Sequence, residues 1–217
     1  MRVFIGVDPR DVVSYSVLRW SIERRATKPV SVTPLILPQL PITRKGLTEF
    51  TFTRYAVPAL CGFKGKGLFL DSDMLCLGNI EELFEYEFDD DVAVVKNEQA
   101  FEWPSLMLFN CEGCRNLTVQ YINDETTKPQ AFEWARSVAE LPSEWNHCVG
   151  YDAPREDAKL VHYTTGTPGF KERRACEYSE QWHAELRSLT AQSSWLEVHG
   201  RSVHRGRVLE ELGLGNQ

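Results

Sequence analysis

The sequence lacks several features that would assign a protein to a class at once. No stretch of about 18 apolar residues is present, which argues against a membrane-spanning helix. Basic residues are not in excess: 24 lysines and arginines against 31 acids give a net charge of −7, so a nucleic-acid-binding protein is not expected. Internal repeats and low-complexity segments are also absent. The 217 residues, 42% hydrophobic and 25% charged, are typical of one globular domain with appendages.

Cysteines are few and scattered, which argues against a small disulfide-bonded scaffold. One CxxC pair occurs, Cys111 and Cys114, but a zinc site would need a second pair and no redox motif surrounds this one. We interpret both as structural thiols. The N-terminal residues 1–7 enter a predicted strand and lack a charged leader with a cleavage site. We therefore expect a reduced, cytoplasmic protein.

Short apolar runs alternate with helical patterns along most of the chain. Apolar runs of four to eight residues predict strands, and apolar residues at helical spacing predict helices. The predicted strands are residues 3–7, 30–37, 67–70, 92–95, 106–110 and 159–163, and the predicted helices are 12–25, 50–60, 115–123, 131–140 and one that begins near 177. A strand–helix–strand opening is typical of parallel pairing. We predict an α/β fold: a Rossmann-like domain whose mixed, mostly parallel central sheet is flanked by helices.

Two acids separated by one residue follow the third predicted strand. Along an extended chain, residues i and i+2 point the same way, so Asp71 and Asp73 can direct both carboxylates to one point. The carboxyl ends of parallel strands are where ligands bind in open α/β sheets. Hard oxygen ligands suit Mg²⁺ or Mn²⁺. The plainer alternative is a turn, for which Asp-Ser-Asp is also suitable.

Three further candidates, Asp8, Arg54 and His162, each have a plain alternative. Asp8 ends the first strand and is either a ligand contact or the N-cap of the next helix. Arg54 precedes the acid-bearing strand and is either a surface residue or a phosphate contact. His162, near the end of the last strand, is either a core residue or a ligand. A glycine-rich loop at 164–171 follows it, and Lys171 would supply a positive charge for phosphate.

Three other groups have no assigned role in the predicted site. The acidic triplet at 89–91 is predicted to be a solvated turn, and the tryptophans 103, 134 and 145 fit either sugar stacking or core packing. A C-terminal basic cluster fits either a solvated tail or a weak contact with acidic lipid or substrate. This cluster consists of Arg201, His204, Arg205 and Arg207.

Five segments, taken together and in order, resemble a known family. They are Ile5-Gly6-Val7-Asp8, Phe52-Thr53-Arg54-Tyr55, Phe69-Leu70-Asp71-Ser72-Asp73, Met107-Leu108-Phe109-Asn110 and His162-Tyr163-Thr164. The set resembles glycosyltransferases of the GT-A fold, in particular family 8 and its small bacterial and phage-type relatives, from about residue 3 to 171. The resemblance implies a catalytic domain at 1–175, followed by a helical extension at 176–217 with a frayed tail.

The resemblance also implies a role for each matching residue. Asp71 and Asp73 would hold a divalent ion with His162 as the third ligand, and the imidazole favours Mn²⁺ over Mg²⁺. Lys171 would contact the donor's diphosphate, so Asp71, Asp73 and Lys171 are the expected catalytic residues. The remaining expected contacts with the nucleotide-sugar are Asp8 to the base, Arg54 near the nucleotide, Ser72 near the ribose, and Gly166 in the diphosphate loop.

The implied activity is transfer of a sugar from a nucleoside-diphosphate sugar, with a UDP-sugar as the leading candidate, to a hydroxyl of a glycan, lipid or protein. Family 8 enzymes retain the anomeric configuration, which implies retention here. The sugar is not predicted, because Trp103-Pro104-Ser105 replaces the family's usual Asn-Ala-Gly and its later Asp-Gln pair is not found. Four carboxylates could serve as base or nucleophile, and nothing ranks them: Glu98, Glu102, Glu144 and Asp152.

Three alternatives stay open. A haloacid-dehalogenase-type phosphatase also carries Asp-x-Asp after a strand, but that pattern calls for Thr or Val where this chain has Leu75. A nucleotidyltransferase would carry a glycine-rich signature after the first strand, where this chain has residues 8–10, Asp-Pro-Arg. A protein that binds a nucleotide-sugar without transferring it would show the same residues.

Overall fold

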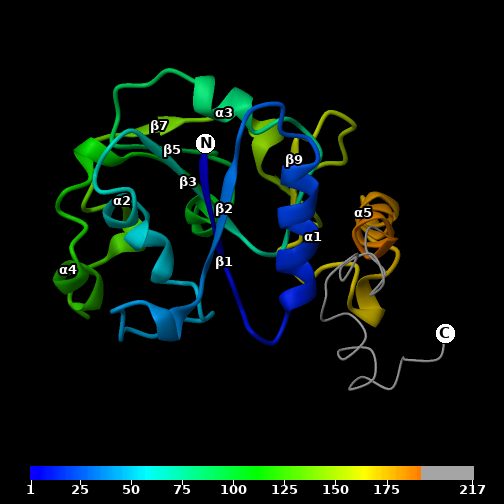
Figure 1. Cartoon of the computed structure of the whole chain (residues 1–217), viewed down its shortest axis with the longest axis horizontal. Coiled ribbons are helices and arrows are strands. Elements are labelled where there is room, and N and C mark those ends of the chain that lie inside the picture. Colours follow the sequence, from blue (N-terminus) through cyan, green and yellow to red (C-terminus); the bar gives the residue numbers. More distant parts are fainter. Residues whose placement is uncertain (192–217) are drawn as a thin grey trace, which may run out of the picture.

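The computed structural model describes residues 1–191 of the protein (Figure 1). The basic cluster at 201–207 and the predicted frayed tail therefore lie outside the described residues. Among residues 1–191, none of the helices combines the length and the apolar character needed to cross a membrane.

A six-stranded sheet lies at the centre of the described part of the chain, in the order β2-β1-β3-β6-β5-β7. β1 pairs in parallel with β2 and β3, β5 pairs in parallel with β7, and β6 is antiparallel to its neighbours β3 and β5. The predicted mixed, mostly parallel sheet is thus confirmed. The strands are β1 (Arg2–Gly6), β2 (Ser31–Leu35), β3 (Lys66–Asp71), β5 (Val92–Val94), β6 (Leu106–Asn110) and β7 (Val138–Glu140).

A second, smaller sheet follows directly from the first. Its order is β4-β9-β8, with β4 (Met74–Cys76), β9 (Leu160–His162) and β8 (His147–Cys148). β4 is antiparallel to β9, and Met74 lies opposite His162. Only residues 72 and 73 separate β3 from β4, so the chain passes from one sheet to the other at the Asp-x-Asp segment.

Helices flank the larger sheet on both sides, as predicted. In Figure 1, α1 and α5 lie to one side of the strands, and α2 and α4 lie to the other. α5 is tied to α1 by Glu185, whose carboxylate pairs with Arg24 at 3.0 Å and Arg25 at 2.7 Å. The helices are α1 (Val12–Glu23), α2 (Val57–Leu60), α3 (Glu81–Glu85), α4 (Val119–Asn123) and α5 (Ser179–Ala191).

β3 is buried on both faces, which explains its uninterrupted apolar sequence. Successive side chains of a strand point to opposite faces. Leu68 and Leu70 therefore pack in one core with Ile22 of α1, while Phe69 packs in the other core with Val57 of α2. All three β3 side chains are fully buried, so the strand that ends in Asp71 is firmly held.

The predicted helix at 131–140 is wrong. The segment instead ends in the edge strand β7, and it begins with a 3₁₀ turn after which Phe132 adopts a left-handed conformation with φ 58°. Its course is set by Asp91, whose carboxylate accepts hydrogen bonds from the Arg136 backbone N at 2.8 Å and from its Nε at 3.1 Å. Asp91 is thus a buried partner and not part of a solvated turn.

The remaining differences are smaller. The predicted helix at 50–60 is a 3₁₀ turn, Thr53–Ala56, followed by the short helix α2, and the predicted helix at 115–123 is helical only from Val119. All six cysteines lie within the described residues and are free thiols. Cys111 and Cys114 are buried in the core, as expected of structural thiols.

Candidate functional site

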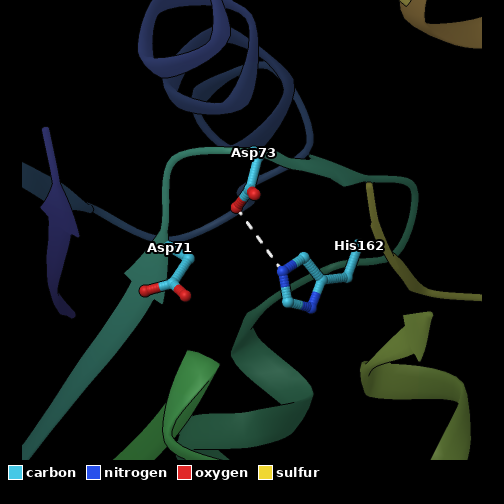
Figure 2. Close-up of side chains that lie close together, drawn as sticks. All are labelled: Asp71, Asp73 and His162. Atoms are coloured by element: carbon cyan, nitrogen blue, oxygen red, sulfur yellow. Dashed lines mark ion pairs between the residues drawn. The ribbon is translucent and has the colours of Figure 1, made fainter. Parts of the chain in front are cut away.

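Asp71, Asp73 and His162 converge where the two sheets meet (Figure 2). One ligand atom from each residue can be chosen so that all lie within 4.8 Å of one another. The backbone explains this placement. Asp71 ends β3 and His162 ends β9, while Asp73 precedes Met74, the residue paired with His162. The Tyr163 N donates to the Asp73 O at 2.9 Å, which extends the pairing to the second acid.

Asp71 is buried beside an equally buried arginine. The Arg54 Nη2 lies 2.9 Å from the Asp71 Oδ1, and the Arg54 Nη1 donates to the Pro104 O at 2.7 Å. Burial raises the pKa of Asp71 to about 7, since it outweighs the opposing charge of Arg54, and the nearby Asp73 acts in the same direction as burial. Arg54 therefore balances only part of the negative charge at this point.

Over the described range, the second acid, Asp73, lacks a partner as close as Arg54 is to Asp71. The Asp73 Oδ1 is buried, makes no good hydrogen bond within the described residues, and lies 3.5 Å from the His162 Nε2. Burial by itself would lower the pKa of His162, but the adjacent Asp73 carboxylate outweighs burial and raises it. A buried carboxylate oxygen without a partner is costly, and a bound cation would supply the missing interaction.

Asn146 orients the imidazole. The His162 Nδ1 lies 3.2 Å from the Asn146 Oδ1, which can only accept, so Nδ1 carries a proton. Nε2 is then the nitrogen that faces the acids, and a bound cation would take the place of its proton. Asn146 is itself buried and donates to the Ser105 Oγ at 3.1 Å. Such an outer partner commonly fixes the tautomer of a metal-binding histidine. No sequence pattern pointed to Asn146, which was predicted only as part of a loop at 141–146.

The donor set fits a divalent cation. Two carboxylates and one correctly oriented imidazole are ligands for Mn²⁺ and, through the oxygens, for Mg²⁺. The two acids lie close together with one arginine paired to Asp71, and among residues 1–191 one Asp73 oxygen has no hydrogen-bond partner. Both observations favour a cation at this point.

A cavity of about 310 Å³ opens above the three side chains. Its lining includes Arg54, Glu102 and Thr164 besides Asp71, Asp73 and His162. Of the four carboxylates that the sequence left unranked, Glu102 alone lines this cavity. Burial raises the pKa of Glu102, and the Asp73 charge contributes to the increase. An acid whose pKa is raised inside a cavity with metal-type ligands is a candidate for proton transfer.

Other predicted residues lie outside the lining of this cavity: Asp8, Ser72, Gly166 and Lys171. Asp8 follows β1 at the same sheet edge as Asp71, because Gly6 pairs with Asp71. Its carboxylate lies 2.6 Å from the Arg10 Nη2, and this hydrogen bond lowers the pKa of Asp8. The N-cap interpretation of Asp8 is wrong, since Asp11 caps α1.

The glycine-rich loop leaves the cavity as it proceeds. Thr164, at its beginning, lines the cavity, and its Oγ1 is buried without a hydrogen-bond partner in the described part of the chain. Gly166 adopts φ +110°, a conformation suited to glycine, and a Cβ there would lie 3.2 Å from Phe170. Lys171 follows in an exposed 3₁₀ turn, Lys171–Arg173, beyond the cavity lining.

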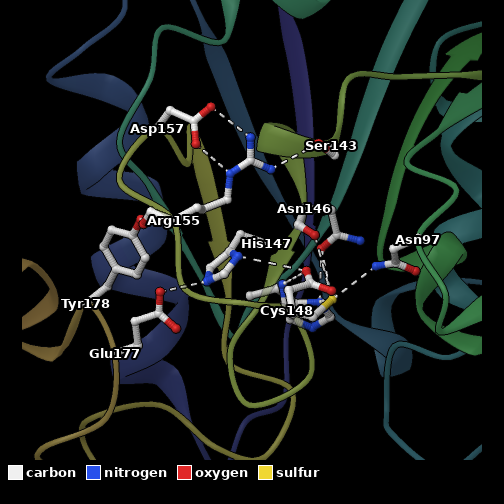
Figure 3. A network of polar contacts seen from close by, with 11 residues as sticks. Asn97, Ser143, Asn146, His147, Cys148, Arg155, Asp157, Glu177 and Tyr178 are labelled. Carbon is white, nitrogen blue, oxygen red and sulfur yellow. Dashed lines mark hydrogen bonds and ion pairs between the residues drawn. The ribbon is translucent and has the colours of Figure 1, made fainter.

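A polar network holds β8, the strand next to Asn146 (Figure 3). The His147 Nε2 lies 3.0 Å from the Glu177 Oε1, and the Cys148 backbone N donates to the Asp152 Oδ2 at 2.7 Å. Arg155 pairs with Asp157 across the same region. The network connects β8 to the segments that follow it and so supports the position of Asn146.

The tryptophans have a plain explanation. Trp134 and Trp145 are buried members of the two main cores, and Trp103 packs against one of these cores while its Nε1 donates to the Asn97 O at 2.9 Å. Core packing therefore accounts for all three.

Comparison with solved structures defines the class of fold. The chain superposes on the bifunctional glycosyltransferase WbbM with a TM-score of 0.69 at 17% identity over 93% of this chain and 51% of WbbM. It superposes on the glycosyltransferase GlyE of Streptococcus pneumoniae TIGR4 with a TM-score of 0.63 at 17% identity, covering 88% of this chain and 63% of GlyE. The chain thus spans about half the length of WbbM and under two thirds of GlyE.

A third structure is matched over nearly its whole length. The galactosyltransferase LgtC, solved in complex with donor and acceptor sugar analogues, gives a TM-score of 0.64 at 12% identity over 90% of this chain and 99% of LgtC. At these identities the likeness shows the fold. The chain has the glycosyltransferase fold expected from the GT-A resemblance, and membership of family 8 stays a prediction.

Sequence comparison places the chain in a family. It is 31% identical over 224 residues to Protein CDI of Arabidopsis thaliana, a match that covers 85% of each chain. The chain therefore belongs to the family of Protein CDI. No family model matches the sequence.

Proposed function

We propose that the protein is a metal-dependent glycosyltransferase that moves a sugar from a nucleoside-diphosphate sugar to an acceptor hydroxyl. The observation that carries this proposal is the convergence of Asp71, Asp73 and His162 at a cavity floor, in a chain with a glycosyltransferase fold. His162 comes from the smaller sheet and lies far along the chain from Asp71 and Asp73, so a plain turn does not account for the meeting of the three.

Asp71, Asp73 and His162 would hold Mn²⁺, with Mg²⁺ as the alternative; the imidazole nitrogen favours Mn²⁺. When bound, the ion would neutralise negative charge on the leaving diphosphate. Arg54 compensates Asp71 and keeps its carboxylate in place, while Asn146 holds the imidazole with Nε2 toward the acids. The cation site is thus oriented before a donor arrives, which is the arrangement that electrostatic catalysis requires.

The nucleotide-sugar contacts are part of the same proposal. Asp8 would contact the base, Arg54 the nucleotide and Ser72 the ribose, with a UDP-sugar as the leading candidate. Gly166 would let the loop backbone approach the diphosphate, and Lys171 would add a second positive charge there. Because Lys171 lies beyond the cavity lining, its contact requires the donor to extend out of the cavity past Thr164.

The acceptor hydroxyl needs a group that takes its proton, and Glu102 is our candidate because it lines the cavity and has a raised pKa. The family 8 resemblance implies a product of retained anomeric configuration. Proton NMR of the product's anomeric proton tests this: an inverted product would end the retaining assignment and leave sugar transfer intact.

A thermal-shift screen of nucleoside diphosphates and their sugars, with and without Mn²⁺, tests the proposal. A ligand that binds the folded chain stabilises it by mass action, by about 2.7 kcal/mol at a hundred times its Kd. We expect UDP to raise the melting temperature of the wild-type protein only with Mn²⁺ present, and not to raise that of Asp73→Ala.

Donor turnover separates catalysis from binding. We expect Mn²⁺-dependent release of UDP from a UDP-sugar, or transfer of its sugar to an added acceptor. If no nucleoside diphosphate shifts the melting temperature with Mn²⁺, the proposal is refuted. Binding of UDP with Mn²⁺ but without hydrolysis or transfer from any donor would instead favour a non-catalytic nucleotide-sugar-binding protein.

A further inference from the structure

The mouth of the cavity carries exposed aromatic side chains. Phe101 is 67% exposed and Tyr151 is 48% exposed, and both line the cavity. Their rings form an edge-to-face pair with centroids 6.1 Å apart and an interplanar angle of 76°. A third lining residue, Leu47, is almost entirely exposed. Exposed apolar groups that gather at a cavity mark a binding surface more often than isolated ones do.

The two rings come from distant segments that are each held by the backbone. Phe101 lies in the 3₁₀ turn Ala100–Ser105, which is anchored where the Glu102 N donates to the Gln99 O at 2.8 Å. Tyr151 follows Gly150, whose φ of +87° allows the chain to turn, and the Tyr151 N donates to the Cys148 O at 3.1 Å. The pair is therefore positioned by local structure in the absence of any ligand.

Polar side chains line the same cavity as this pair. Thr48, Thr51, Glu102 and Gln130 supply hydroxyl, carboxylate and amide groups to the same cavity. Aromatic faces combined with hydrogen-bonding side chains match a pyranose ring, which has an apolar C–H face and hydroxyls around its edge. A lipid chain favours a lining that is apolar throughout, whereas this lining combines apolar side chains with hydroxyl, amide and charged groups.

We propose that Phe101 and Tyr151 form a stacking platform for a pyranose ring of the acceptor, so that the acceptor is a carbohydrate. This inference rests on the proposed function, in which the donor binds at Asp71, Asp73 and His162 in the same cavity. The platform belongs to the same cavity as Asp73 and His162, so a sugar stacked on it lies at the entrance to the donor site. Glu102, the chain neighbour of Phe101, also lines this cavity.

The test compares Phe101→Ala and Tyr151→Ala with Leu60→Ala in the full-length chain. Leu60 is 48% exposed, as Tyr151 is, but it lies on α2 and outside the cavity lining. Titration calorimetry with UDP and Mn²⁺ measures binding at the proposed donor site. Saturation-transfer difference NMR reports acceptor binding for a panel of methyl pyranosides and for octyl β-glucopyranoside below its micelle concentration. It is recorded with UDP and Mg²⁺, because paramagnetic Mn²⁺ would broaden the ligand signals.

We expect one or more pyranosides to bind the wild-type protein, with saturation of the ring protons and not of the octyl chain. Each aromatic-to-alanine variant should bind that pyranoside about fivefold to tenfold more weakly, the scale of one lost aromatic contact. Leu60→Ala should bind it as the wild type does. UDP binding should be unchanged in all three variants.

The outcomes separate the two proposals. If UDP binds with Mn²⁺ but no pyranoside binds, or if the aromatic variants bind pyranosides as tightly as Leu60→Ala, the platform is refuted and the proposed function stands. Saturation of the octyl chain in place of the ring would also refute it, in favour of a lipid acceptor. If UDP itself does not bind, the proposed function falls and the acceptor platform falls with it.

Discussion

The two sheets of this protein contribute differently to the candidate site. The larger sheet is buried on both faces around β3, whose side chains at 68–70 are fully buried between two cores. The smaller sheet consists of strands of two or three residues. Asp71 belongs to the larger sheet and His162 to the smaller one, while Asp73 lies in the crossing between them. The ligand set therefore exists only when both sheets are in place.

This difference suggests that stability and metal binding can be changed separately. Burial of apolar side chains is the dominant favourable contribution to folding, and most of it is in the cores around the larger sheet. The smaller sheet mainly fixes where His162 and its neighbours lie. A substitution at the crossing should thus alter metal binding with little effect on folding, whereas a substitution in the cores around the larger sheet, away from Asp71, should do the reverse.

The largest effect is expected at the crossing itself. Asp73→Ala and His162→Ala each remove a ligand, so Mn²⁺-dependent turnover should fall by about 10³-fold, the scale for losing an electrostatic contact with the transition state. Circular dichroism should show a folded chain for both variants. Glu85→Gln, at an exposed position of α3, is the control. If Asp73→Ala keeps full activity in metal-stripped buffer, the metal assignment is wrong.

Arg54 affects both folding stability and metal binding, because it is buried and pairs at 2.9 Å with Asp71, a proposed metal ligand. Arg54→Ala would leave a buried carboxylate without its partner, and we expect a loss of about 3–5 kcal/mol in the free energy of unfolding. Arg19→Ala breaks an exposed i,i+4 pair with Glu23, and should cost only about 0.3–0.5 kcal/mol. Urea unfolding measures both. Equal losses in the two variants would contradict a structural role for the Arg54–Asp71 pair.

Substitutions at Asn146 test how the region around the smaller sheet contributes to metal binding. Because Asn146 accepts from the His162 Nδ1, Asn146→Ala should weaken Mn²⁺ binding by about 10- to 100-fold, the scale of outer-partner substitutions. Asn146→Asp keeps an acceptor at this position and should bind Mn²⁺ more tightly than Asn146→Ala. Titration calorimetry with Mn²⁺ measures all three chains. Unchanged affinity in Asn146→Ala would mean that packing alone orients the imidazole.

The sequence predicted the larger sheet better than the smaller one, and the reason is physical. Strands buried on both faces, such as β3 and β6, are continuous apolar runs and are visible without a structure. β4 and β8 are two or three residues long, too short to show any periodicity, and neither was predicted. β7 was predicted as helix because its pairing depends on Asp91, which is distant in the chain.

The candidate site shows the same division. The Asp-x-Asp pair could be proposed from strand geometry, and His162 from the resemblance, because both lie at the ends of recognisable strands. Asn146 could not, since its role comes from a contact with a residue 16 positions away and from no local pattern. Phe101 and Tyr151 were likewise missed, because only their exposure at the cavity mouth distinguishes them from core aromatics.

Apart from the Arg19 control, the smallest expected effect lies next to the larger sheet, away from the site. Asp91 is 1% exposed and accepts hydrogen bonds from the N and Nε of Arg136, whose side chain is largely exposed. Asp91→Asn should lower the free energy of unfolding by about 1 kcal/mol at neutral pH, because solvent screens the arginine. Mn²⁺ binding should be unchanged, since Asp91 does not line the cavity. A loss of Mn²⁺ affinity in this variant would contradict the separation between the two sheets.

The pH dependence of the stability lost in Asp91→Asn identifies the cause of that loss. Burial would raise the pKa of Asp91, but the hydrogen bonds and charge of Arg136 outweigh it, so the pKa lies below its usual value in the folded chain. The carboxylate therefore stabilises the fold fully above its unfolded pKa, about 3.9, and this contribution is lost as the pH falls through the lower folded value. Urea unfolding of wild type and Asp91→Asn should give curves that are separated at pH 7 and converge on acidification below the unfolded pKa. Curves that stay equally far apart down to the folded pKa would show that packing of the side chain, and not its charge, connects β5 to the segment before β7.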